Sequence, residues 1–232
     1  MAEPYFIWNN MNSTSKNLWL SQYPDDVRAA ERQSVITVPG RPGALTIKEG
    51  DSVYDPVKLA CRVQCKRSEN SDVLSNWLCG SGLVVFGNQP TRARMAKITN
   101  EVRFVRISND LKEASVIFEC EPFKRAYPAE SDITLTASTT ELNNVGNVPA
   151  QPVIKINGSG DIVLTVNGNE FEVKDVTAQA ILDCSARIAT EAGESILTQT
   201  SGIFPVLNVG NNSVSWEGAV SSVVITPNWR YR

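Results

Sequence analysis

The side chains that most often carry out catalysis are scarce in this sequence of 232 residues. It contains no histidine, so it cannot build a Ser-His-Asp triad, a Cys-His pair or a zinc site with imidazole ligands. Carboxylate pairs of the kind that cleave glycosidic bonds remain, as Asp25-Asp26 in a loop-like stretch and as Glu119 with Glu121 on a predicted strand. All four are also ordinary surface positions for acidic residues. The sequence nominates no catalytic residue, and we expect a protein that is not an enzyme.

Metal and cofactor sites are not indicated either. The five cysteines are an odd number without a CxxC spacing, and most lie in apolar stretches, which is typical of reduced, buried thiols. Cys61 and Cys65 would share one face of a strand, but no second pair of ligands accompanies them. Gly158-Ser159-Gly160 is glycine-rich, yet we predict a turn between strands there, without the following helix that binds phosphate. We expect no metal and no cofactor.

The charge balance argues against nucleic-acid binding. Lysine and arginine number 22 against 25 acidic residues, a formal net charge of -3, whereas phosphate binding needs a basic surface. The first residues lack the basic start and apolar core of a signal peptide, and no stretch approaches the roughly 20 apolar residues of a membrane helix. We therefore expect no membrane partner and synthesis in a cytoplasm.

The five tryptophans open one alternative function, because exposed aromatic rings can stack on sugars. Trp77 falls on a predicted helix stripe and Trp216 on the inward face of a predicted strand, so both are assigned to a core. Core or interface packing is favoured for these rings, which leaves only Trp8, Trp19 and Trp229 as candidates for surface aromatics. A carbohydrate-binding, lectin-like module is the alternative that they support.

The apolar pattern has a period of two over most of the chain, which predicts short β-strands joined by turns. The longest early strand is predicted at Val57 to Cys65, with its odd-numbered residues on one buried face. One short helix is predicted at Asp72 to Leu78, with Asn70, Ser71 or Asp72 as its cap and Gly80 closing its end. Its predicted core-facing stripe consists of Val73, Leu74, Trp77 and Leu78.

A stiff excursion is predicted near residue 40. The strand Ser34 to Val38 is rich in β-branched residues and leads into Pro39-Gly40-Arg41-Pro42-Gly43, where prolines and glycines prevent continued pairing. A second strand is predicted from Ala44 to Ile47, followed by a turn around Gly50.

We predict an all-β protein of two domains, with one short helix in the first. The N-terminal domain, 1–125, is predicted to be a β-sandwich, and 126–152 is a connector rich in Thr, Asn, Pro and Gly with one strand at Ile133 to Ala137. The C-terminal domain, 153–232, has several short, evenly spaced strands with turn residues between them, including the hairpin signal Asn167-Gly168-Asn169, and is predicted to be a second β-sandwich.

Two stretches of the sequence resemble one protein family. The first half contains FIWNNMNSTSKNLWL, ERQSVITVPGRPGALTI and VLSNWLCGSGLVVF, and the second contains PVIKINGSGDIVLTVNGNEF, ILDCSARIA and GIFPVLNVGNNSVSWEGAVSSVVITPNWRYR. The motifs PGR-x-G, WL-x-G and FP-x-L-x-x-G-x-N occur in this order. Together they resemble the distal tail proteins (Dit family) of long-tailed bacteriophages of the siphophage type, with an N-terminal "belt" domain and a C-terminal galectin-like domain.

This resemblance implies a structural virion protein of the phage tail tip, or baseplate, made in the cytoplasm of a host bacterium. It implies a homo-hexameric ring that connects the tail tube protein to the tail-associated hub protein and lets DNA pass through its channel without specific binding. Receptor-binding proteins or side fibres are further implied partners, although the connector lacks the large inserts of family versions that carry carbohydrate-binding modules. Within that ring we expect the subunit interface to involve Pro39, Gly40, Arg41, Pro42, Gly43 and Gly50.

Overall fold

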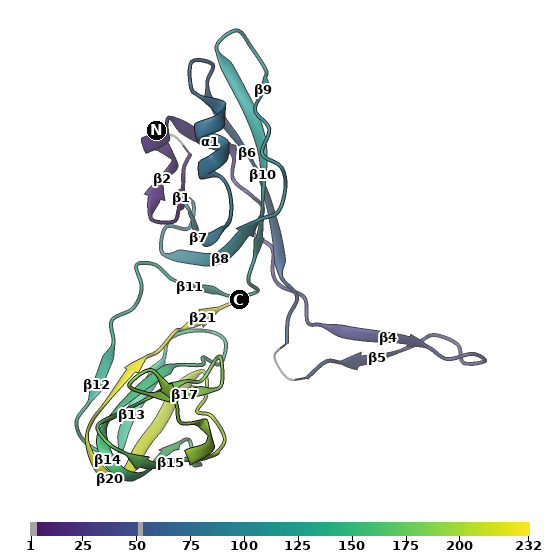
Figure 1. Ribbon diagram of the computed structural model, residues 1–232. Coiled ribbons are helices and arrows are strands. Elements are labelled where there is room, and N and C mark those ends of the chain that lie inside the picture. Colours follow the sequence, from purple (N-terminus) through teal and green to yellow (C-terminus); the bar gives the residue numbers. More distant parts are fainter. Residues whose placement is uncertain (1–3, 51–52) are drawn as a thin grey trace. The chain divides into compact units, whose positions relative to one another are not determined.

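A computed structural model describes residues 4–50 and 53–232 of the chain, and these form two compact units. Unit 1 comprises residues 1–127 together with Arg232, and unit 2 comprises residues 128–231. The prediction of an all-β protein with one short α-helix in its first half is confirmed for the described residues (Figure 1). None of the helices in these ranges is long and apolar enough to cross a membrane.

Unit 1 is built on one antiparallel sheet with the strand order β2-β1-β7-β8-β10-β6-β3, to which β9 adds beside β10 and β11 beside β8. A separate two-stranded sheet is formed by β4 and β5. The elements of this unit are β1 (Phe6–Trp8), β2 (Met11–Asn12), the 3-10 helix η1 (Ser13–Lys16), β3 (Leu18–Gln22), β4 (Gln33–Thr37), β5 (Ala44–Lys48), β6 (Val57–Lys66), α1 (Ser71–Trp77), β7 (Ser81–Phe86), β8 (Arg92–Ile98), β9 (Val105–Arg106), β10 (Leu111–Cys120) and β11 (Lys124–Ala126).

The core of unit 1 follows from the period of two in its long strands. In β6 the odd-numbered residues from Val57 to Cys65 are buried and pair along β10, as the sequence predicts. The sheet curls, so that β1 lies against β10 across the core. The rings of Phe6 and Trp8 in β1 pack against the Phe118 ring of β10, with centroid distances of 5.9 Å and 5.4 Å, respectively. The amide of Leu20 in β3, at one end of the sheet, donates at 2.8 Å to the carbonyl of Pro4, which lies just before β1 near the other end.

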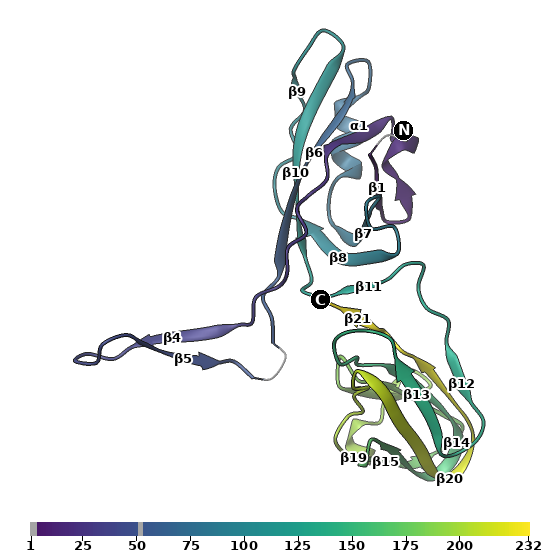
Figure 2. The ribbon, with the colours of Figure 1, turned by 180° about the vertical axis from the view of Figure 1, so that it is seen from behind.

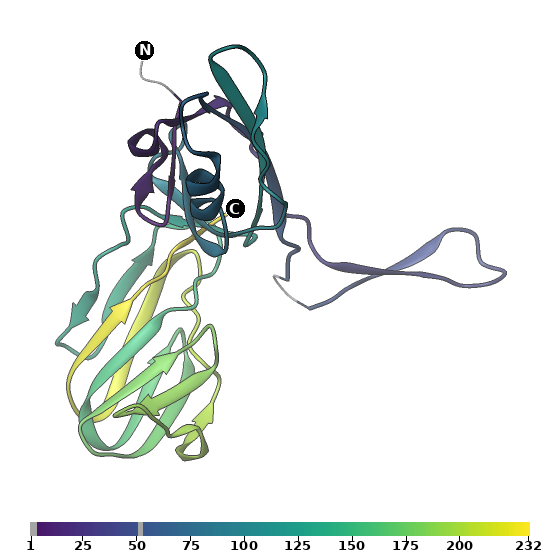
Figure 3. The ribbon, with the colours of Figure 1, turned by 45° about the horizontal axis from the view of Figure 1, so that its top comes forward.

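Helix α1 covers part of this core and lies between the N-terminal strands and β10 (Figure 3). Asn70 is its N-cap, since its side-chain oxygen accepts from the Asp72 amide at 2.9 Å. Leu74 and Leu78 are buried, as predicted, and Trp77 of the same predicted stripe is half-buried and stacks on Phe6. The prediction for Val73 is wrong: it is exposed, because a helix of seven residues presents only a narrow stripe to the sheet.

The described residues of unit 2 contain one continuous nine-stranded sheet that wraps around its own core (Figure 2). Its main path is β12-β20-β14-β16-β17-β18, with β13 beside β20, and β15 linking β14 to β19. The elements of this unit are β12 (Ile133–Leu135), β13 (Thr140–Asn144), β14 (Val153–Val166), β15 (Asn169–Val176), β16 (Gln179–Asp183), β17 (Ile188–Glu191), β18 (Glu194–Ser195), the 3-10 helix η2 (Leu197–Gln199), β19 (Thr200–Gly202), β20 (Gly210–Thr226) and β21 (Arg230–Tyr231).

Two long strands carry this sheet from one layer of the sandwich to the other. The first half of β14 pairs with β16 and its second half with β15, while β20 follows it throughout with bulges after Asn157 and Ser159. The predicted turn at Gly158-Ser159-Gly160 is therefore wrong, because β14 bends there without ending. At the matching bend in β20, Gly218 has φ +106°, and a Cβ there would lie 2.5 Å from the Asp161 carbonyl oxygen.

The segment expected to be a connector, 126–152, contributes two strands to unit 2. β12 corresponds to the strand predicted at Ile133 to Ala137, and β13 was not predicted. Both pair with β20, β12 with its second half and β13 with its first. Thr140 is half-buried and Asn143 exposed in β13, whereas Asn144 is buried and donates to the carbonyls of Val148 and Leu207. A strand with so many polar residues has the composition of a loop, which is why it was not predicted.

Candidate assembly site

The most exposed apolar part of the described chain is the hairpin 33–48, here called the arm. β4 and β5 pair from Gln33 with Lys48 to Thr37 with Ala44, and every residue except Ser34 is exposed. The arm extends from unit 1 as a two-stranded ribbon, seen in Figure 2 at the lower left. A lone hairpin is marginally stable in water, so an arm of this kind is suited to binding another surface.

The two faces of the arm differ in chemistry. Ile36 and Leu45 lie directly opposite each other, and Ile47 lies two residues from Leu45, so the three side chains share one face. They are 46%, 39% and 45% exposed, respectively. We call them the apolar face of the arm. The opposite face carries Thr46 and Thr37 around Val35, and is more polar.

The predicted interface residues lie at the two ends of the arm. Pro39 to Gly43 form its tip, where Gly40 and Gly43 both have φ +80° and the Arg41 amide donates to the Val38 carbonyl at 3.2 Å. Gly50 lies just beyond β5, at the root, with φ +93°. The structure thus brings the tip residues together as one exposed turn and places Gly50 apart from them.

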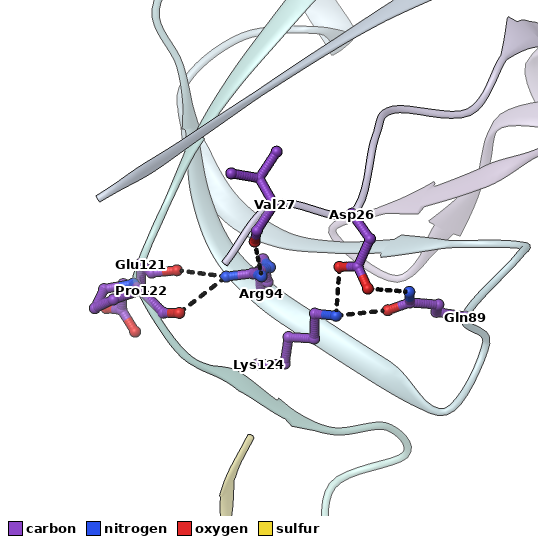
Figure 4. A network of polar contacts seen from close by, with 7 residues as sticks. All are labelled: Asp26, Val27, Gln89, Arg94, Glu121, Pro122 and Lys124. Atoms are coloured by element: carbon purple, nitrogen blue, oxygen red, sulfur yellow. Dashed lines mark hydrogen bonds and ion pairs between the residues drawn. The ribbon is translucent and has the colours of Figure 1, made fainter. Parts of the chain in front are cut away.

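The chain that leads into the arm is anchored by a buried arginine (Figure 4). Arg94 on β8 is 5% exposed, and its guanidinium donates to the Val27 carbonyl at 3.2 Å and to the carbonyls of Glu121 and Pro122 at 3.1 and 3.0 Å. Burial lowers the pKa of this guanidinium from its usual value, in part offset by Asp26, and a group of this type keeps its charge. One side chain therefore holds two separate segments against β8.

A second contact holds the same approach to the arm. The Lys124 ammonium donates to the Asp26 carboxylate at 2.7 Å and to the Gln89 side-chain oxygen at 3.0 Å, and the Gln89 amide donates back to Asp26 at 3.2 Å (Figure 4). The hydrogen bond from Lys124 lowers the pKa of Asp26, burial opposes this effect, and the hydrogen bond from Gln89 adds to the lowering. The carboxylate is thus the favoured form of Asp26.

The chain on either side of the arm forms two legs, one with Ala29 and Arg32 and the other with Tyr54 and Asp55. These legs contact each other and Arg232. The guanidinium of Arg232 lies 4.2 Å from the centre of the Tyr54 ring, and donates to the Tyr54 hydroxyl and to the Ala29 carbonyl, both at 3.1 Å. Arg32 on one leg forms an ion pair with Asp55 on the other at 2.9 Å. Because this pair is exposed, the buried contacts of Arg94 are the stronger anchors.

A hollow of about 400 Å³ lies on unit 1 next to the root of the arm, and most of its lining is apolar. Its lining includes Tyr54, Pro56, Met95 and Pro122 and four charged residues: Arg32, Lys97, Glu119 and Glu121. We call this the root hollow.

The residues considered for catalysis fall into two different hollows on unit 1: Asp25 and Asp26 line one, and Glu119 and Glu121 line the root hollow. Glu121 pairs with Arg125 at 2.9 Å, Glu119 lies opposite Lys97 across two strands, and Asp26 is occupied by Lys124. Within the described ranges, no group of three or more cysteine and acidic side chains is arranged to hold a metal ion.

The cysteines are mostly buried, as predicted, with Cys79 the exposed exception. Burial raises the pKa of Cys61 and of Cys184 to about 12, and that of Cys120 to about 11. These three thiols are therefore protonated and unreactive at neutral pH.

Two of the three candidate surface tryptophans are buried. Trp8 is fully buried and Trp229 is 5% exposed, because strands from distant parts of the sequence close over both rings. Trp19 is half-buried on β3. The structure thus removes two of the three rings on which the lectin-like alternative depends.

Sequence reasoning missed the anchors of the arm. Arg94, Lys124 and Arg232 lie on or next to strands, and their partners come from segments 27 to 203 residues away. A basic residue inside the apolar pattern of β8 was the one available signal, since a buried charge needs partners.

The class of fold is defined by these features together: two all-β units, a curled sheet with one short helix in the first, and a strand-bent sandwich in the second. No family model matches the sequence, and no curated protein does. Among solved structures, the chain is similar to Dit (gp 19.1) of phage SPP1, described as a paradigm of the hub adsorption apparatus in phages that infect Gram-positive hosts.

The similarity to SPP1 Dit has a TM-score of 0.71 and covers 97% of this chain and 99% of that protein, at 12% sequence identity. At this identity the comparison establishes a shared fold. The resemblance to phage distal tail proteins predicted from the sequence is confirmed at that level.

Proposed function

We propose that this chain is a structural protein of a phage tail tip, a distal tail protein that assembles into a homo-hexameric ring. The ring joins the tail tube to the tail-associated hub protein, and DNA passes through its channel. The protein has no enzymatic role in this proposal, is made in the cytoplasm of the host bacterium and ends in the virion. Its predicted partners beyond the ring are the tail tube protein, the hub protein and receptor-binding proteins or side fibres.

The observation that carries this proposal is the arm, on a fold shared over 97% of the chain with SPP1 Dit. Its apolar face exposes three aliphatic side chains that a monomer leaves in water. Complete burial of a fully exposed aliphatic side chain contributes roughly 1.5–3 kcal/mol. These three are already more than half covered, so each would contribute less than half of that, which still favours subunit contacts made by this face. A closed ring needs two different complementary patches on each subunit, and the arm is a candidate for one of them.

Passage of DNA places a further demand on such a ring. A channel rich in lysine and arginine would retain phosphates, whereas a nearly neutral or acidic wall lets the genome slide. The net charge of -3 supports this part of the proposal. A ring whose channel proved strongly basic in an experimental structure would contradict it.

The proposal is tested by negative-stain electron microscopy and mass photometry of the purified full-length protein, classified without imposed symmetry. Six-fold rings with an open centre are expected. Leu45→Asp places a charge in the apolar face and is expected to abolish the rings.

The matched control is Thr46→Asp, which places the same charge on the opposite face of the same strand. This variant should retain ring assembly. Wild-type protein that remains monomeric at its highest soluble concentration would contradict a self-assembling ring, and equal loss of rings in both variants would contradict the role of the apolar face.

A further inference from the structure

We propose that unit 1 binds a neutral oligosaccharide on the outer face of its sheet, with one sugar in a polar hollow at the end of β3 and the next sugar against the Trp19 ring. This inference goes beyond the proposed ring and does not depend on it. It concerns the one candidate surface tryptophan that the fold leaves partly exposed, since Trp19 is half-buried on β3.

A hollow of about 260 Å³ lies where β3 ends beside β6, and most of its lining is polar. We call it the polar hollow. Its polar side chains are those of Gln22, Asp25, Arg62 and Ser115, and all four residues are exposed. Pockets for drug-sized ligands have volumes of roughly 300–1,000 Å³, so a hollow of this size suits a single sugar ring.

The polar hollow offers the donors and the acceptors that sugar hydroxyl groups need. The Asp25 carboxylate accepts hydrogen bonds, and the Ser115 hydroxyl both donates and accepts them. The Arg62 guanidinium donates, and the Gln22 side-chain amide does both. One acidic and one basic residue line the hollow, so their formal charges cancel. A neutral ligand rich in hydroxyl groups therefore matches this lining better than an anion or a cation does.

The Arg62 guanidinium is available to a ligand, and the backbone that carries it is held. Its side chain is 70% exposed, and its ion pair with Glu113 is long, at 3.8 Å, so it engages few of the five N–H donors of the group. The Ser21 hydroxyl donates to the Arg62 carbonyl at 3.2 Å, and the Tyr5 amide donates to the Tyr23 hydroxyl in the wall of the hollow at 3.3 Å. A wall fixed before binding lowers the entropy cost of ordering it around a ligand.

Trp19 lies on the same face of the sheet as the polar hollow. It pairs with Gln64 of β6, and Gln22 at the end of the same strand pairs with Arg62. Gln64 and Arg62 both lie on the outer face of β6, because Val63 between them is buried. Residues two apart on one face of a strand are separated by about 7 Å. Consecutive sugars of one chain can therefore occupy the hollow and stack on the indole ring.

The site is tested by saturation-transfer NMR with the full-length protein and four neutral trisaccharides: maltotriose, cellotriose, chitotriose and globotriose. At least one is expected to bind saturably and more tightly than its component monosaccharides, because a single sugar cannot fill the hollow and also reach Trp19. Asp25→Asn and Arg62→Ala are each expected to weaken binding at least tenfold, since each removes a charged hydrogen-bonding group. Trp19→Ala is expected to weaken it at least fivefold.

Lys58→Ala is the matched control for Arg62→Ala. Lys58 is exposed on the same face of the same strand and lies outside the lining of the polar hollow, so this variant should keep wild-type affinity. A one-dimensional proton spectrum of each variant verifies that it is folded. Absence of saturable binding by all four trisaccharides would overturn the site, and so would equal affinity of the Arg62→Ala and Lys58→Ala variants. Either result leaves the proposed ring intact, because rings are scored separately by electron microscopy.

Discussion

Replacing Arg94 with methionine is expected to destabilise unit 1 strongly. The substitution keeps an unbranched side chain of similar reach but removes a guanidinium that donates to three backbone carbonyls. Each hydrogen bond from a charged group contributes about 1.5–3 kcal/mol to stability, and the variant loses three of them. The variant also avoids the cost of burying a charge, which offsets part of this loss. The expected net loss is about 2–4 kcal/mol in the free energy of unfolding.

This loss is measured by hydrogen exchange of resolved peptides at increasing urea concentration, which separates unit 1 from unit 2. With a urea dependence of roughly 1–3 kcal/mol per molar, the midpoint of unit 1 should fall by about 1–2 M. The transition of unit 2 serves as an internal reference, and Arg103→Met, at an exposed position, serves as the matched variant. A loss below about 0.5 kcal/mol, the usual effect of a surface change, would refute the role of Arg94 as an anchor.

Other expected outcomes test individual contacts. Hydrogen bonding lowers the pKa of Asp26 in the folded state, so this carboxylate stabilises the protein at pH values above its unfolded-state pKa. That stabilisation is lost as the pH falls through the folded-state pKa. Asp26→Asn should therefore lower the free energy of unfolding at pH 7 and leave it equal to that of wild type in acid, as measured by urea titration at each pH. Gly160→Ala should lower the free energy of unfolding by about 1–2 kcal/mol, because Gly160 has a positive φ although there is open space for a Cβ. Gly218→Ala should lower it more, because a Cβ there also meets the Asp161 carbonyl oxygen. Asn70→Ala should cost about 1 kcal/mol through loss of the helix cap, measured by chemical denaturation. In native protein a thiol reagent at pH 8 should modify Cys79 rapidly and the buried cysteines only on unfolding, and Cys79→Ser should remove the rapid phase.

The sequence predicted well those strands in which the alternation of apolar and polar residues along the strand itself identifies the buried face. In β6 the alternation from Val57 to Cys65 matches the buried face, because side chains alternate sides whatever the strand pairs with. The tip of the arm was also predictable, since Pro39 to Gly43 cannot continue a ladder and the β-branched residues before them favour a strand.

Errors arose where two distant segments act together. Gly158 and Gly160 have the local composition of a turn, yet β20 runs alongside and carries the hydrogen bonds across the bulge, so the strand continues. The burial of Trp8 depends on the curl of the sheet that brings β10 over it. No window of sequence contains both partners.

The sequence by itself determined the all-β class of fold, the period-two strands, the capped helix and the stiff turn of the arm, because these depend on backbone sterics and on neighbours along the chain. Only the tertiary structure decided that the arm is left uncovered on both faces, that a hollow lies at its root, and that Arg94 anchors its approach. The physical reason is that exposure and the partners of a buried charge are properties of surfaces assembled from segments far apart in the chain.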